Sequence, residues 1–108
     1  MMDATIHMTV PPEKWKEILQ TLKALMGPIR SEQGCICCNC YVDAEADNTL
    51  FFKNEWTTRA ALEDHLRSVH FSVLIGAMKL LDSKPLIRFA TISSTEGVEA
   101  IAAARQFG

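Results

Sequence analysis

The sequence predicts one α+β domain built around a four-stranded antiparallel sheet. The 108 residues suffice for one domain and are too few for two. Short alternating or apolar runs, typical of strands, are separated by two longer stretches with apolar residues at helical spacing. The order is therefore strand, helix, strand, strand, helix pair, strand. This is the ferredoxin-like βαββαβ arrangement, in which both helical elements cover one face of the sheet.

The first strand and the first helix follow from residue spacing. In the run Thr5–Val10 every second residue is apolar, which is the period of a half-buried strand. Pro12 suits the first turn of a helix, and apolar residues then recur every three or four positions to about Met26. We expect Gly27 and Pro28 to break this helix, and the alternative left open is a further helical turn over Ile29–Glu32.

The middle of the chain predicts a β-hairpin. Two runs rich in apolar and aromatic residues, Cys35–Val42 and Thr49–Trp56, flank a short polar loop. The elements expected after the hairpin are a helix capped by Thr57 or Thr58, a second helical run from about His70 to Leu81, and a final strand over Leu86–Ile92.

We expect the domain to span residues 1–92 and residues 93–108 to form a C-terminal helical extension. Ser93 and Glu96 have the spacing of a capping box, which favours a short helix from Glu96 to about Gln106. A frayed tail is the alternative interpretation.

Both faces of the predicted sheet carry apolar side chains. Strict alternation in the second strand places Ile36, Cys38 and Cys40 on one face. It places Cys35 and Cys37 on the other. A single subunit would then expose a large apolar patch, a feature that marks interfaces. We therefore expect a homodimer in which two sheets pack face to face across a twofold axis.

Composition argues against two classes of partner. The formal net charge is −2 with mixed signs, so no basic stripe is available for nucleic acid. No apolar run approaches the roughly 20 residues of a membrane-spanning helix. The amino terminus lacks a signal-peptide pattern, which favours a cytoplasmic location.

Four motifs point to a known family. They are Glu55-Trp56 followed after eight residues by H-L-x-S-x-H-F from His65 to Phe71, T-V-P-P-E-K from Thr9 to Lys14, E-x-G-C with a later Y-x-D between Glu32 and Asp43, and the closing strand from Pro85 to Ala90. Together they resemble the antibiotic biosynthesis monooxygenase (ABM) domain over about residues 4 to 92.

This resemblance implies a dimeric α/β barrel, with a cavity between the sheet and the helices of each subunit. It also implies oxidation of phenols or quinols by molecular oxygen with no metal or flavin cofactor. The deprotonated substrate would supply the electrons. Haem-degrading members use an Asn, a Trp and a His at the positions of Ile6, His65 and Ile75, so haem degradation is not expected here.

The leading hypothesis is a small cofactor-independent monooxygenase that acts on an aromatic, phenolic or quinol metabolite. His65 lies at the edge of the apolar helical face, and a histidine can accept a phenolic proton near neutral pH. A histidine that only fixes the helix, and a Trp56 that only fills the core, are the alternatives. The predicted catalytic residues are His65 and Asn54, and the predicted substrate-binding residues are Met8, Phe52, Trp56, His70 and Phe71.

Two other functions stay open from the sequence. One is a dimer that binds a small molecule in the same cavity without turnover. The other is a thiol or metal sensor built on Cys35, Cys37, Cys38 and Cys40. Alternation along a strand separates these thiols onto two faces, so no metal site is expected. Core packing is the favoured interpretation of the cysteines.

Overall fold

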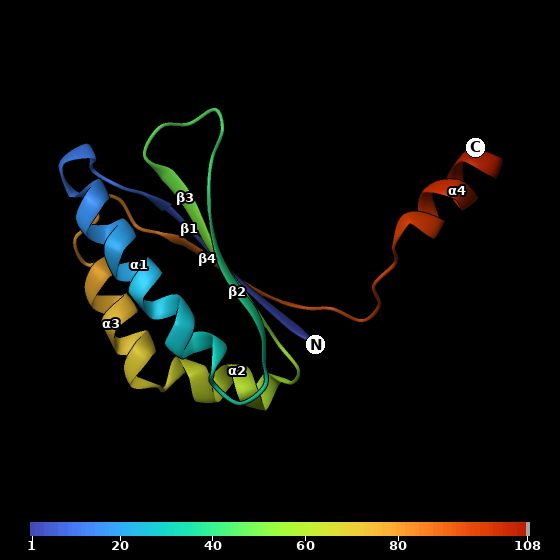
Figure 1. The fold of residues 1–108 in the computed structure, drawn as a ribbon, viewed down its shortest axis with the longest axis horizontal. Helices are drawn as coiled ribbons and strands as arrows, with labels where there is room; N and C mark the ends of the chain where they lie inside the picture. The colour runs from blue at the N-terminus through green and yellow to red at the C-terminus, as the bar shows by residue number, and fades with distance from the viewer. Residues whose placement is uncertain (108) are drawn as a thin grey trace.

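The computed structural model describes residues 1–107 and shows the predicted ferredoxin-like fold. A four-stranded antiparallel sheet has the order β2-β3-β1-β4 (Figure 1). The elements are β1 (Met2–Thr9), a 3₁₀ turn (Pro12–Lys14), α1 (Trp15–Arg30), β2 (Cys35–Val42), β3 (Thr49–Trp56), α2 (Arg59–Leu66), α3 (Val69–Met78), β4 (Leu86–Thr91) and α4 (Val98–Phe107).

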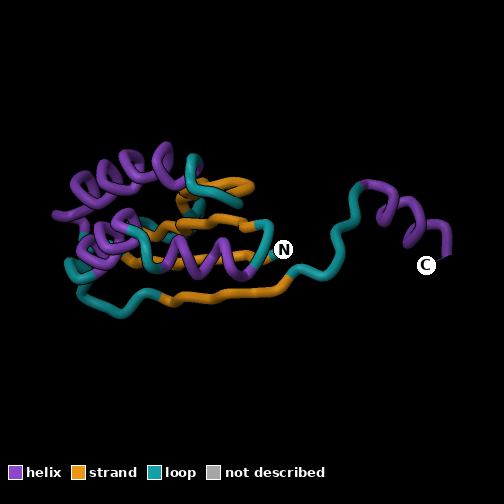
Figure 2. Tube along the Cα trace, turned by 90° about the horizontal axis from the view of Figure 1, so that it is seen from below, coloured by secondary structure: helices purple, strands orange, loops and turns teal. Residues whose placement is uncertain are grey.

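The helices α1, α2 and α3 lie on one side of the sheet, as expected, and the other side is left open (Figure 2). Between the two layers is a continuous core of buried side chains. Its largest fully buried members include Trp56, Phe52, Met8, Ile18 and Leu22. The covered face of the sheet therefore provides the core.

Strand β1 begins three residues earlier than its alternation predicts. Met2 pairs with Trp56 and Ala4 pairs with Asn54 across the β1–β3 ladder. Both Met2 and Ala4 are buried. Pairing with β3 therefore determines where β1 begins, and the alternation within β1 does not show this start.

The expected break at Gly27-Pro28 is wrong, because α1 continues through Pro28 to Arg30. Proline in a helix removes one backbone hydrogen bond and crowds the preceding turn. Two contacts of the last turn oppose that cost. The Ile29 side chain is fully buried, and Arg30 Nε donates to the Cys38 carbonyl oxygen at 2.9 Å.

Strand β2 has the predicted bounds but not the predicted alternation. Cys35 pairs with Trp56 and Cys37 pairs with Glu55, so a β-bulge at Ile36 shifts the register. Cys35 therefore joins Cys38 on the covered face of the sheet, and the expectation that it shares a face with Cys37 is wrong.

The chain beyond β4 forms a helix, α4, which starts at Val98. The capping box predicted at Ser93 is wrong, since Ser93 lies five residues before that start. The carboxylate that serves the helix start is that of Glu99, whose Oε1 accepts from the Gly97 backbone N–H at 2.7 Å. This bond holds the pKa of Glu99 below its usual range.

Candidate functional site

One carboxylate, that of Glu32, holds two histidine rings. Glu32 Oε2 lies 3.0 Å from His65 Nδ1 and 3.1 Å from His70 Nδ1. An ionised carboxylate only accepts hydrogen bonds, so the Nδ1 atom of each neutral ring carries the proton and donates it. The Nε2 atom of each ring then keeps a free lone pair. The cluster of Glu32, His65 and His70 thus presents two proton acceptors.

Two helix caps fix the histidines. The Thr58 side chain accepts from the Ala61 backbone N–H and starts α2, which carries His65 in its last turn. Ser68 accepts from the Phe71 N–H and starts α3, which carries His70 in its first turn. The short connection between α2 and α3 therefore points both rings toward Glu32.

A tight turn after α1 fixes Glu32. Gly34 has φ +83°, a conformation that favours glycine, and its carbonyl oxygen accepts from Thr57 N at 2.8 Å. A Cβ at this position would lie 2.5 Å from the Ala61 Cβ. Glycine is thus required for the loop that carries Glu32 to approach the start of α2.

Aromatic rings enclose His65, which is 2% exposed. Its ring stacks on Trp56 with centroids 4.6 Å apart and meets the Phe71 ring edge-on at 5.4 Å. The Trp56 indole Nε1 donates to Asn54 Oδ1 at 2.7 Å. Asn54 therefore sets the plane of the indole against which His65 lies.

The structure brings together five of the predicted site residues and separates the other two, Met8 and Phe52, from them. Trp56 and Met8 lie at opposite ends of the β1–β3 ladder, about 20 Å apart at 3.3 Å per residue. Phe52 lies between these ends and is fully buried. The grouped residues are His65, His70, Asn54, Trp56 and Phe71.

Glu32 is the residue that sequence reasoning missed. It occurs in the E-x-G-C motif, but its partner His65 is 33 residues away in the chain. No periodic pattern connects a loop carboxylate to a helix so distant in sequence. The E-x-G-C motif is the one signal that marks Glu32, and it does not predict this role.

The surroundings of the four thiols disfavour the ionised, nucleophilic form. Burial raises the pKa of the Cys38 thiol from 9.0 to about 12, and the nearby Cys35 thiol adds to that shift. Burial also raises the pKa values of Cys35, Cys37 and Cys40. Within residues 1–107 no three His, Cys, Asp or Glu side chains gather in a way that could hold a metal ion. These observations favour packing as the role of the cysteines.

We expect the folded protein to react slowly with a disulfide reagent at about pH 8, and the urea-unfolded chain to expose all its thiols at once. The folded thiol pKa values lie above the unfolded value of 9.0, so the unfolded state loses these protons first. Stability should therefore fall as pH rises from 9.0 toward 12, the folded pKa of Cys38. Rapid thiol reaction in the folded protein would support the sensor hypothesis.

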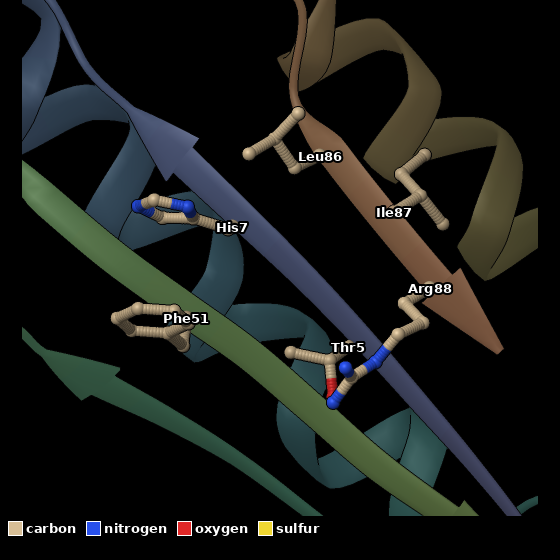
Figure 3. Close-up of a pocket in the computed structure, with 6 residues that line it drawn as sticks. All are labelled: Thr5, His7, Phe51, Leu86, Ile87 and Arg88. Atoms are coloured by element: carbon tan, nitrogen blue, oxygen red, sulfur yellow. The ribbon is translucent and has the colours of Figure 1, made fainter. Parts of the chain in front are cut away.

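The open face of the sheet carries a shallow pocket of about 290 Å³. His7 of β1 and Phe51 of β3 are paired in register, and their rings stack with centroids 4.5 Å apart (Figure 3). Arg88 of β4 extends toward Thr5, and Leu86 closes one end. Polar and apolar groups alternate here, so this face is less apolar than the sequence predicts.

Two further pockets lie on the helical side. One, of about 310 Å³, borders the Gly34 turn and the start of α2. The other, of about 270 Å³, is a groove on α1 lined by Trp15, Lys16, Leu19, Gln20 and Lys23. His65 lines none of the three pockets. No helix in the described part of the chain is long and apolar enough to cross a membrane.

Comparison with known proteins establishes the family. The family model for "Antibiotic biosynthesis monooxygenase", ABM, matches residues 1–76. The chain belongs to the ABM family. An uncharacterized protein of Synechocystis sp., sll1783, is 32% identical to this ABM chain over 91 residues. That match covers 83% of this chain and 62% of the relative, so this chain spans less than two thirds of the relative's length.

Solved structures show the same ABM fold. A conserved protein from Methanosarcina mazei is similar with a TM-score of 0.78 and 28% identity, over 82% of this chain and 89% of that one. Rv0793 from Mycobacterium tuberculosis is similar with a TM-score of 0.80 and 20% identity, over 89% and 98% of the two chains. Family membership supports a monooxygenase-like role in general terms.

Proposed function

We propose that this ABM protein oxidises a phenolic or quinol metabolite with molecular oxygen and without a bound cofactor. The observation that carries the proposal is the pair of histidines held by Glu32 next to two aromatic rings. His65 and His70 both direct Nδ1 to the carboxylate, which leaves each Nε2 as a proton acceptor. Trp56 and Phe71 flank His65, and the half-buried Phe71 ring offers a flat surface to an aromatic substrate.

In this proposal the substrate enters where His70, whose side chain is 31% exposed, and the half-buried Phe71 reach the surface. His65 takes the phenolic proton, or anchors the hydroxyl while His70 takes it. Asn54 orients the substrate and oxygen by fixing the Trp56 ring. Phe52 and Met8 support the site from the core behind it.

Loss of the phenolic proton makes the ring electron-rich, and one electron passes to oxygen. The substrate radical and the superoxide formed in this step then combine. Where an activated CH₂ group becomes a carbonyl, one oxygen atom enters the product and the other leaves as water. The substrate supplies all four electrons. A simple quinol would instead give a quinone and hydrogen peroxide, with two electrons and two protons passing to oxygen.

The homodimer belongs to the same proposal. The open sheet face carries exposed Tyr41 and Leu86 and the Phe51 ring, beside the positive charges of Lys53 and Arg88 and the negative charge of Glu55. Packing two such faces would bury the apolar groups, and opposite charges could pair across a twofold axis.

The test is oxygen consumption by the purified, metal-free protein with a dihydroquinone or an anthrone-type phenol. We expect uptake well above that of the His65→Ala variant. Arg67→Ala is the matched control, because Arg67 is exposed and forms only a surface ion pair with Asp64. Thermal unfolding of each variant shows whether it is folded. Equal uptake by folded wild-type and His65→Ala proteins would rule out this role for His65.

Binding without turnover is the second candidate. The observation that favours it is the burial of His65 at 2% exposure among packed rings. A ligand that co-purifies with the protein, together with no oxygen uptake, would support this alternative against the oxidation.

A further inference from the structure

Helix α4 stands apart from the rest of its own subunit. Residues 92–97 lead away from β4, and α4 extends beyond the sheet and the other helices (Figures 1 and 2). The last sheet bond runs from Ile92 N to the Met1 carbonyl oxygen at 2.8 Å. The radius of gyration is 16.0 Å, against about 13 Å for a compact domain of this length. The excess comes from this projecting segment.

A ten-residue helix alone in water is marginal, because isolated helices usually need about 12–15 residues. Val98 and Ile101 are 78% and 61% exposed. With Ala102 they share one side of α4 by their spacing of three and four residues. Helix α4 therefore presents an apolar side that needs a surface.

The groove on α1 has matching chemistry. It is lined by the half-buried Trp15 and Leu19 and by the exposed Lys16 and Lys23. Burial raises the pKa of the Cys40 thiol in β2, and the nearby Lys23 ammonium offsets part of that rise. Helix α1 packs on β2, so the groove sits beside the β2 edge of the sheet. The apolar side chains of the groove suit the apolar side of α4. Its two lysines suit the acidic residues at the start of α4.

The acidic residues are Glu96 and Glu99, at the start of α4. Within one subunit, β2 and β4 form opposite edges of the sheet, so α4 leaves from the edge far from the groove. A second copy can bring its groove to α4. Extended, residues 92–97 span about 20 Å. This reach matches the distance to the partner's helix layer, because two stacked sheets are about 10 Å apart and a helix layer adds about 10 Å more.

We propose that residues 92–107 form an arm whose helix docks in the α1 groove of a second copy of this chain. The proposal rests on the homodimer proposed above. By symmetry each subunit gives one arm and receives one. The arm holds two copies together in addition to the contact between the open sheet faces.

The test places a photoreactive benzoylphenylalanine at Ile101 in the full chain. Equal amounts of unlabelled and ¹⁵N-labelled protein are mixed, allowed to exchange and irradiated. We expect cross-linked peptides that join the arm to residues 15–23 and carry one light and one heavy partner. Cross-links only between peptides of the same isotope, or none to residues 15–23, would overturn the arm.

Matched variants give an independent reading by sedimentation at about 10 µM. Ile101→Asp should raise the dimer dissociation constant about tenfold or more, because it puts a charge in the apolar contact. Ala103→Asp adds the same charge on the opposite side of α4 and should not. Equal dissociation constants for the Ile101→Asp and Ala103→Asp variants would overturn the arm.

A charge exchange tests the groove. Lys23→Glu should weaken the dimer, and adding Glu99→Lys should restore part of the affinity. No change from Lys23→Glu would overturn this groove as the receiving surface. A full chain that is monomeric would refute both the dimer and the arm. A dimer that forms without arm cross-links refutes only the arm, and oxygen uptake reports separately on the oxidation.

Discussion

Glu32→Gln is expected to lower kcat for quinol oxidation about 10- to 100-fold, a part of the 10²–10⁴ that general acid–base catalysis supplies. The amide keeps the size of Glu32 but removes the charge that accepts from His65 and His70. Glu32 is a positioning residue in this account, so KM should change less than kcat. Stability should fall by about 1.5–3 kcal/mol through the lost charge-assisted bonds.

The positioning role has its own readout in the ¹⁵N chemical shifts of the imidazole rings. In the wild type we expect both neutral rings to carry the proton on Nδ1, and in Glu32→Gln a mixture of tautomers. Glu13→Gln is the matched control, because Glu13 is exposed on the turn before α1. Unchanged tautomers together with wild-type kcat in Glu32→Gln would remove Glu32 from the mechanism.

Trp56→Ala is expected to lower the free energy of unfolding by about 3–5 kcal/mol. Trp56 is fully buried, stacks on His65 and donates to Asn54. Its removal would open a cavity and leave the Asn54 oxygen without that donor. Since domains are stable by only about 5–15 kcal/mol, this variant should lie near the limit of folding. Urea unfolding followed by circular dichroism at one protein concentration measures the change.

Trp56→Phe separates packing from hydrogen bonding. The phenyl ring keeps much of the buried area but has no donor for Asn54, so about 1–3 kcal/mol should be lost. If Trp56→Ala costs less than Trp56→Phe, the ring is not the core element that its burial indicates.

Much of the fold could be predicted because it depends on local patterns. The bounds of β3, Thr49–Trp56, follow from its composition and from the turn residues around it. The bulge at Ile36 and the continuation of α1 through Pro28 depend on contacts with other elements. Alternation and helix-breaking rules describe a segment alone, and they fail where tertiary contacts decide.

The site was only partly accessible for the same reason. His65 could be singled out by its place on the apolar side of a helix, and Trp56 by its place at the end of a strand. That the Asn54 amide oxygen accepts from the Trp56 indole, and that Glu32 holds both histidines, depends on how the loop after α1 meets α2 and α3. Such a meeting point has no signature in the spacing of residues.

The most direct measurement of the proposed chemistry is a single oxidation under ¹⁸O₂ in ordinary water. The metal-free protein is given an anthrone-type phenol, and the product is analysed by mass spectrometry. We expect one ¹⁸O atom in the new carbonyl and a rate that falls strongly in Glu32→Gln. A product without ¹⁸O from O₂, formed at the same rate with and without protein, would contradict the proposed chemistry.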